Sequence, residues 1–137
     1  MKKNVIIVGA GLAGSLCALY MLKREYNVSI YERRPDMRKI KLVAGRSINL
    51  ALSTRGWTAL EKVEADKHVK RIAIPMPKRI MHDVEGNLTD QYYGNQDQAI
   101  YSVPRAELNV LLMNLAEQKG ANIFFNHKCV DVNIDRP

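Results

Sequence analysis

The chain has 137 residues, of which 47% are hydrophobic and 26% charged, and its formal net charge is +7. These values are typical of a globular domain of ordinary size and argue against a mainly disordered chain or a repeat array. The only two cysteines, Cys17 and Cys129, lie far apart without a CxxC or Cys/His cluster. This spacing argues against a disulfide framework or a zinc site and favours a reducing, cytoplasmic location.

A basic chain can bind nucleic acid, an anionic membrane or small anionic ligands. The densest basic run, "RRPDMRKIK" at 33–41, contains one acid and no aromatic residue that could stack on a base. We therefore interpret it as a solvated loop and expect no nucleic-acid partner. Residues 4–22 are uncharged, but three glycines divide them into a strand and a helix, so we expect no membrane segment in this chain.

The first elements predict a βαβ unit, with a strand at 4–9, a helix at 12–25 and a parallel strand at 27–32. A polar loop follows to about residue 44. The segment "GRSINLALS" then leads into a helix at 53–64 whose apolar residues share one face, and Ser53 is its expected N-cap.

From residue 72 to 102 the pattern changes to short β-like runs. "KRIMHDV" and "LTDQYY" flank "EGN" and predict a hairpin, and "AIYSV" predicts a further strand. A helix is predicted next, with Pro104 in its first turn and Gly120 as its stop. "ANIFFNH" and "KCVDVNI" are predicted to be closing strands.

The glycine-rich turn "GAGLAG" lies between the first strand and the first helix. Gly9 permits a tight turn, Gly11 lets a diphosphate approach the backbone, and Gly14 lets the helix lie close to the strand. Glu32 ends the second strand about 20 residues on, where an acid accepts hydrogen bonds from a ribose. The sequence thus predicts a dinucleotide site that prefers NAD or FAD to NADP, because an acid disfavours a 2′-phosphate.

The order of elements after the second strand favours FAD over NAD. An NAD-binding half would continue to alternate strands and helices, whereas this chain turns into a loop, "GRSINLALS" and a β excursion. We expect Arg46, held between Gly45 and Ser47, to contact phosphate or ribityl oxygens, because a guanidinium can donate two parallel hydrogen bonds.

Six segments carry a family resemblance. In chain order they are "VGAGLAGS", "YERRPDMR", "GRSINLALSTRG", "IPMPKR", "YYG" and "YSVPRAELN". Together they resemble the kynurenine 3-monooxygenase family of FAD-dependent aromatic hydroxylases. The resemblance implies an α/β fold, namely a Rossmann-like FAD-binding domain interrupted by a β-rich substrate domain. It also implies NADPH as co-substrate and hydroxylation of L-kynurenine to 3-hydroxykynurenine, in tryptophan degradation and NAD biosynthesis.

The resemblance also implies roles for individual residues. FAD contacts would fall on Ala13, Tyr31, Glu32, Arg33, Arg34, Ala51, Arg105 and Cys129. The substrate carboxylate would bind Arg79, and Tyr93 would donate a hydrogen bond to it. No catalytic acid or base is implied, because the cofactor carries the chemistry.

The hairpin register gives an independent test of the Arg79 and Tyr93 pair. If Glu85, Gly86 and Asn87 form a three-residue loop, Arg79 lies directly opposite Tyr93 on one face. A two-residue loop of Gly86 and Asn87 would place them on opposite faces.

By this resemblance residues 1–71 begin the FAD-binding domain, 72–103 begin the β excursion toward the substrate domain, and 104–137 return to the FAD-binding domain. We expect the chain to be the N-terminal part of a longer enzyme, inactive alone, with an exposed apolar surface and a tendency to self-associate. The alternatives are a non-catalytic FAD- or NAD-binding module and another flavin-dependent aromatic hydroxylase.

Overall fold

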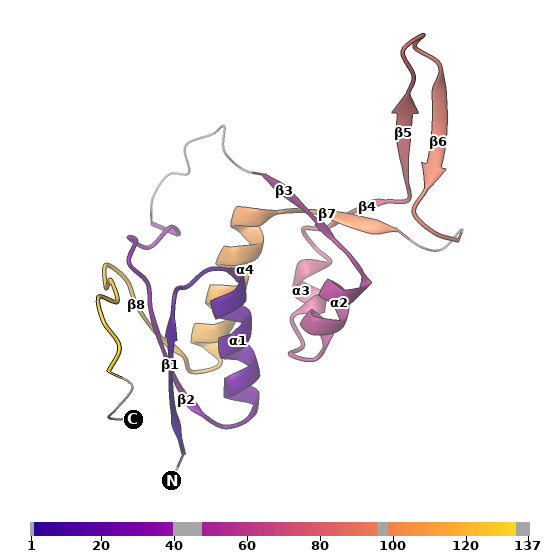
Figure 1. The fold of residues 1–137 in the computed structure, drawn as a ribbon. Helices are drawn as coiled ribbons and strands as arrows, with labels where there is room; N and C mark the ends of the chain where they lie inside the picture. The colour runs from indigo at the N-terminus through magenta and orange to yellow at the C-terminus, as the bar shows by residue number, and fades with distance from the viewer. Residues whose placement is uncertain (1, 40–47, 96–98, 134–137) are drawn as a thin grey trace. The chain divides into compact units, whose positions relative to one another are not determined.

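The computed structural model describes residues 2–39, 48–95 and 99–133 (Figure 1). It divides into two compact units. The first comprises residues 1–46 and 108–137, and the second comprises residues 47–107. The predicted domain boundaries at 71/72 and 103/104 differ from this division, because the segment from 47 to 71 makes its contacts within the second unit.

The first unit is built on a three-stranded parallel sheet. Its strands are β1 (Asn4–Val8), β2 (Asn27–Tyr31) and β8 (Asn122–Phe124), in the order β1-β2-β8. The helix α1 (Leu12–Lys23) connects β1 to β2. These bounds confirm the predicted βαβ opening and its parallel strands, and the fold class is α/β and Rossmann-like.

The core of the first unit joins α1, β2 and α4 (Arg105–Gln118). Its largest fully buried apolar side chains are Leu19, Val28, Ile30, Leu112 and Met113. The helix α4 stops as predicted at Gly120, whose φ is +103°. The Gly120 and Ala121 N–H groups donate to the carbonyls of Glu117 and Ala116, which satisfies the end of the helix.

The second unit contains an antiparallel sheet in the order β3-β7-β4. Its strands are β3 (Asn49–Leu52), β7 (Ile100–Pro104) and β4 (Ile74–Met76), and two helices, α2 (Thr54–Glu61) and α3 (Asp66–Val69), lie between β3 and β4 in sequence. Trp57 of α2 packs edge-on against Tyr101 of β7, with ring centroids 5.0 Å apart. Leu60 and Val63 are also buried, as the predicted apolar face requires.

The predicted hairpin is present in the second unit as β5 (Lys78–His82) and β6 (Leu88–Tyr92). Every residue of both strands is exposed. The hairpin is therefore held by its own ladder and turn rather than by a core.

Three local expectations are wrong or only partly met. Residues 128–133 form no strand in the described part of the chain, where Asp131 instead makes short-range bonds with Cys129 and Val132. Pro104 ends β7 rather than entering the first turn of α4. Ser53 occupies the N-cap of α2, but its hydroxyl makes no capping hydrogen bond.

No helix in the described ranges is long and apolar enough to cross a membrane.

Candidate functional site

The glycine-rich turn has the geometry that a diphosphate site needs. Gly9 has a φ of +101°, a conformation that favours glycine, and its N–H donates to the Tyr31 carbonyl at 2.8 Å. A Cβ on Gly14 would lie 1.9 Å from the Gly9 carbonyl oxygen, so only glycine lets α1 pack this closely. Among the residues that the structure describes, a Cβ on Gly11 would meet nothing within 4 Å.

The open space at Gly11 is the observation that fits a bound anion. Gly11 is the N-cap of α1, where the first N–H groups of the helix have no partner within it and the helix dipole is positive. Phosphate groups bind such helix starts, and a dinucleotide diphosphate fits the unfilled side of Gly11. Ala13 is exposed in the same first turn, consistent with its expected role.

Glu32 follows β2 and is buried against this turn, with 5% of its surface exposed. Its Oε2 accepts a hydrogen bond from the Ala10 N–H at 2.9 Å, and its Oε1 accepts two from the Arg34 backbone N–H and Nε, each at 2.9 Å. Burial acts to raise the pKa of Glu32, but the hydrogen bonds from Arg34 and Ala10 outweigh it and hold the pKa at about 2. The carboxylate is therefore charged at neutral pH.

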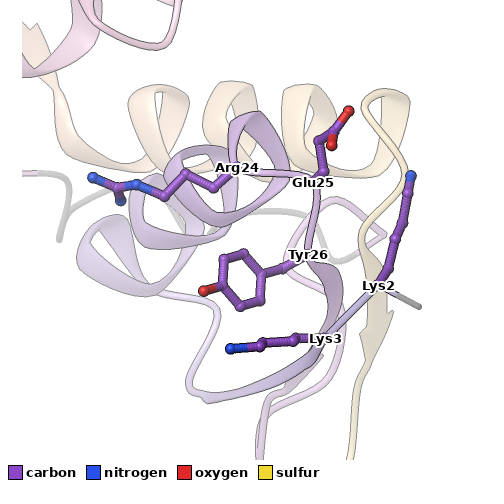
Figure 2. Close-up of a pocket in the computed structure, with 5 residues that line it drawn as sticks. All are labelled: Lys2, Lys3, Arg24, Glu25 and Tyr26. Atoms are coloured by element: carbon purple, nitrogen blue, oxygen red, sulfur yellow. The ribbon is translucent and has the colours of Figure 1, made fainter.

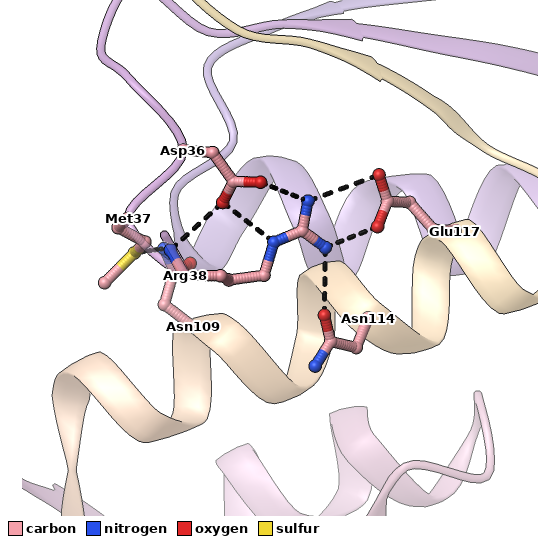
Figure 3. A network of polar contacts seen from close by, with 6 residues as sticks. All are labelled: Asp36, Met37, Arg38, Asn109, Asn114 and Glu117. Carbon is pink, nitrogen blue, oxygen red and sulfur yellow. Dashed lines mark hydrogen bonds and ion pairs between the residues drawn. The ribbon is translucent and has the colours of Figure 1, made fainter. Parts of the chain in front are cut away.

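A polar cluster ties the loop after β2 to α4 (Figure 3). Arg38 donates from Nε and Nη2 to the two carboxylate oxygens of Asp36, each at 2.8 Å, and from Nη1 to Asn114 Oδ1 at 2.9 Å. It also pairs with the Glu117 carboxylate and lies over the ring of Phe125. The hydrogen bonds from Arg38 lower the pKa of Asp36, which keeps this pair charged.

Tyr31 and Cys129 line one open pocket of about 430 Å³ on the outer face of the parallel sheet. The other lining residues are Ile6, Val8, Asn126, His127 and Lys128. Tyr31 stacks on Phe124 with ring centroids 5.0 Å apart. The pocket thus brings together two residues that the resemblance assigns to the cofactor, and their assignment stays a prediction.

Arg33, Ala51 and Arg105 are not among the residues that line this pocket. Arg33 is exposed beside Glu32. Ala51 lies in β3 opposite Ser102, and Arg105 is the first residue of α4, where its N–H donates to the Ile48 carbonyl at 3.3 Å. Both belong to the second unit. Arg46 lies outside the described residues.

The hairpin register differs from the predicted one by two residues. Arg79 lies opposite Gln91, to which its Nε donates at 2.6 Å, and Tyr93 lies opposite Pro77, whose carbonyl accepts the Tyr93 N–H at 3.0 Å. The expected direct pairing of Arg79 with Tyr93 is therefore wrong. Because the shift is an even number, the two side chains still share one face, as diagonal neighbours within reach of long side chains.

The turn chemistry explains this shift. The loop residues are 84–86, because the Asp83 carboxylate accepts hydrogen bonds from the Asn87 N–H at 2.7 Å and from Asn87 Nδ2 at 2.8 Å. Gly86 takes the left-handed position, with φ at +87°. The loop therefore has three residues as predicted, but it begins one residue earlier.

Figure 2 shows the residues of a second open pocket, of about 390 Å³, two of which directly precede β1, whereas the glycine turn follows the end of β1. The pocket is lined by Lys2, Lys3, Arg24, Glu25 and Tyr26. None of these residues was predicted to bind the cofactor, and the pocket does not contain the turn.

Asn109 was not predicted as a site residue; it is 8% exposed and donates from Nδ2 to the Ala10 carbonyl at 3.1 Å. The signal was available, since Asn109 is a polar residue inside the apolar stripe of α4. Asp36 and Arg38 were also missed, because they were interpreted as part of a solvated loop.

Comparison with known proteins agrees with this geometry. Residues 7–40 match the family model of the NAD(P)-binding Rossmann-like domain. The chain is 46% identical over 133 residues to the kynurenine 3-monooxygenase of Flavobacterium psychrophilum, covering 97% of this chain and 29% of that protein. It is 47% identical over 134 residues to the Anopheles gambiae enzyme, covering 96% of this chain and 28% of that protein.

This chain is related in sequence to the kynurenine 3-monooxygenases. It spans less than a third of the length of these curated kynurenine 3-monooxygenases.

Solved structures support the fold. A 2-methyl-3-hydroxypyridine-5-carboxylic acid oxygenase superposes with a TM-score of 0.79 at 18% identity, covering 96% of this chain and 33% of that one. The p-nitrophenol 4-monooxygenase of Pseudomonas putida superposes with a TM-score of 0.76, also at 18% identity, covering 97% of this chain and 34% of that one.

Proposed function

We propose that this chain forms the FAD-binding part of a flavin-dependent, NADPH-using monooxygenase that hydroxylates L-kynurenine to 3-hydroxykynurenine. The main support for FAD is the geometry of the glycine turn. Gly11 leaves space at the N-terminus of α1, and Glu32 is held in its charged form beside it. The sequence similarity to kynurenine 3-monooxygenases supports the choice of substrate. This step belongs to tryptophan degradation and NAD biosynthesis.

A bound flavin would supply the redox and oxygen chemistry, while the residues of this chain bind and orient it. The first-turn N–H groups of α1 would face the diphosphate. Glu32 would accept one hydrogen bond from the ribose, because Oε1 already accepts two bonds and Oε2 one, which leaves one acceptor position on Oε2. The same negative charge would repel a 2′-phosphate and so favour FAD at this turn over NADPH.

Two glycine variants of the full-length protein test the cofactor site. Gly11→Ala places a Cβ where nothing lies within 4 Å, so we expect the fold to be retained while FAD affinity falls about tenfold or more. Gly14→Ala is the matched control, because its Cβ would collide with the Gly9 carbonyl and should lower the melting temperature even without FAD. Flavin fluorescence quenching and thermal unfolding measure the two effects.

Wild-type affinity for FAD in Gly11→Ala would show that no diphosphate lies over Gly11. Tight FAD binding by a protein that never oxidises NADPH in the presence of kynurenine would instead favour a non-catalytic module.

The substrate proposal is tested at the hairpin. Because Arg79 is the guanidinium expected to bind the kynurenine carboxylate, Arg79→Ala should weaken kynurenine binding by about 30-fold and leave FAD affinity unchanged. Lys78→Ala is the control, since Lys78 is the adjacent hairpin residue, points to the other face and pairs with Asp90 at 2.5 Å. Kynurenine titration followed by flavin absorbance provides the measurement, and equal affinities for the two variants would reject the Arg79 role.

A further inference from the structure

Asn109 is a buried polar side chain in an apolar environment. It lies on α4 next to Leu108 and one turn before Leu112 and Met113, all of which are buried. A buried amide is unfavourable unless its hydrogen bonds are satisfied, and an apolar residue at this position would extend the core. The presence of asparagine here therefore calls for an explanation in its contacts.

Those contacts are directed at the glycine turn. Asn109 Nδ2 donates to the Ala10 carbonyl at 3.1 Å and contacts the Met37 sulfur at 3.2 Å. The N–H of the same Ala10 donates to Glu32 Oε2 at 2.9 Å. Both polar backbone groups of Ala10 are thus bound by side chains. Glu32 after β2 accepts from the N–H, and the carbonyl accepts from Asn109 on α4 and, at 3.4 Å, from the Ser15 hydroxyl on α1. The peptide units on either side of Ala10 are fixed as a result, and the second of these carries the Gly11 N–H.

The other half of the Asn109 amide is unsatisfied. Asn109 Oδ1 is buried and has no hydrogen-bond partner within the part of the chain that the structure describes. The amide cannot be reversed, because the oxygen would then face the Ala10 carbonyl oxygen. An asparagine at this position therefore has the cost of an unsatisfied acceptor. We expect such a cost where the donor half of the amide has a specific role.

We propose that Asn109 is a positioning residue for the cofactor turn. By holding the Ala10 carbonyl, it aims the Gly11 N–H and the open side of Gly11 at the diphosphate. The proposal rests on the proposed function, because it assumes that a dinucleotide binds at this turn. It adds a residue on α4, 99 positions away in sequence, to a site otherwise built from the βαβ unit.

The same substitution at two positions of α4 provides the test, in the full-length protein. In Asn109→Leu the bond to Ala10 is lost and the side chain stays close in size, so we expect FAD affinity to fall about tenfold, the equivalent of one hydrogen bond. Asn114→Leu is the matched control, since the Asn114 side chain lies on the same helix but accepts a hydrogen bond from Arg38 instead of binding Ala10. Its affinity for FAD should stay within about twofold of wild type.

Amide hydrogen exchange without FAD is the second measurement. We expect the Ala10 and Gly11 amides to exchange faster in Asn109→Leu and at the wild-type rate in Asn114→Leu. If Asn109→Leu does not fold, Asn109→Ser removes the same bond, because its side chain is too short to reach Ala10.

Equal FAD affinity for wild type and the Asn109 variants would overturn the proposal, as would equal weakening by Asn114→Leu. Failure of the wild-type protein to bind FAD would instead contradict the proposed function. The exchange measurement would still report whether Asn109 holds the turn.

Discussion

At the scale of single residues, Glu32 links the fold to the candidate site. The sequence predicts it as a ribose acceptor, whereas the structure shows it bound to the Ala10 N–H and to Arg34. These contacts place a carboxylate at the turn and keep its charge. They also make the stability of the first unit depend on pH.

The pKa of Glu32 gives the sign of that dependence. It is about 2 in the folded chain against 4.5 for an ordinary glutamate, because the bonds from Arg34 and Ala10 outweigh the effect of burial. The unfolded state therefore takes up the proton first, and the stabilisation is complete above about pH 4.5 and lost as pH falls toward 2. A shift of this size corresponds to at most about 3–4 kcal/mol of unfolding free energy.

Urea unfolding of wild type and Glu32→Gln across this pH range measures the effect. The stability advantage of the wild type should shrink as pH falls from about 5 to about 2, because glutamine does not titrate. An advantage that stays constant over this range would mean that Glu32 is not held in its charged form.

At the scale of elements, the hairpin shows how side chains decide register. Strand composition predicted β5 and β6 correctly, and Gly86 was correctly placed in the loop. The register depended on Asp83, which binds both the N–H and the side-chain amide of Asn87 and starts the loop one residue early. The spacing of Asp83 and Asn87 was available in the sequence. The predicted loop, in which Val84 pairs with Leu88, agreed equally well with the composition of the two strands, so the strands alone could not select the register.

Cysteine pairs can verify this register, in a background with Cys17 and Cys129 replaced by serine. Ile80 lies directly opposite Asp90, whereas the predicted register would place it opposite Tyr92. Opposite residues are close enough for a disulfide, so Ile80→Cys with Asp90→Cys should oxidise readily and Ile80→Cys with Tyr92→Cys should not. Gel mobility with and without reductant reports the outcome, and the reverse result would restore the predicted register.

At the scale of the whole molecule, the parallel sheet of the first unit presents exposed apolar side chains on one face in the described part of the chain. Ile6 and Val8 of β1 are 68% and 61% exposed. Val8 is in register with Tyr31 and Phe124, so an apolar row crosses all three strands on this face. Soluble monomers rarely expose such a continuous apolar surface.

We therefore expect the 137-residue chain to self-associate in solution. Sedimentation velocity over a range of concentrations should show mass increasing with concentration. Ile6→Thr with Val8→Thr should reduce the association while retaining β1, since threonine is also favoured in strands. A wild-type chain that sediments as a monomer at every concentration would contradict this expectation.

The βαβ opening, the glycine turn and the stop of α4 at Gly120 could be predicted from the amino-acid sequence. These features depend on local properties, namely apolar periodicity and backbone conformations that favour glycine. The tight turn at Gly9 and the close packing at Gly14 could also be predicted, because both involve only atoms of β1, α1 and the turn between them.

The contacts of Asn109 with Ala10 and of Arg38 with Asp36 and α4 became visible in the folded chain and could not be predicted. The tertiary structure also decided the division into units at residues 47 and 108 and the absence of a strand at 128–133 within the described chain. These contacts join residues up to 99 positions apart, and a polar side chain looks the same in sequence whether it meets water or a buried carbonyl. Periodicity shows which face of α4 is buried, but the partner on that face is set by packing between elements.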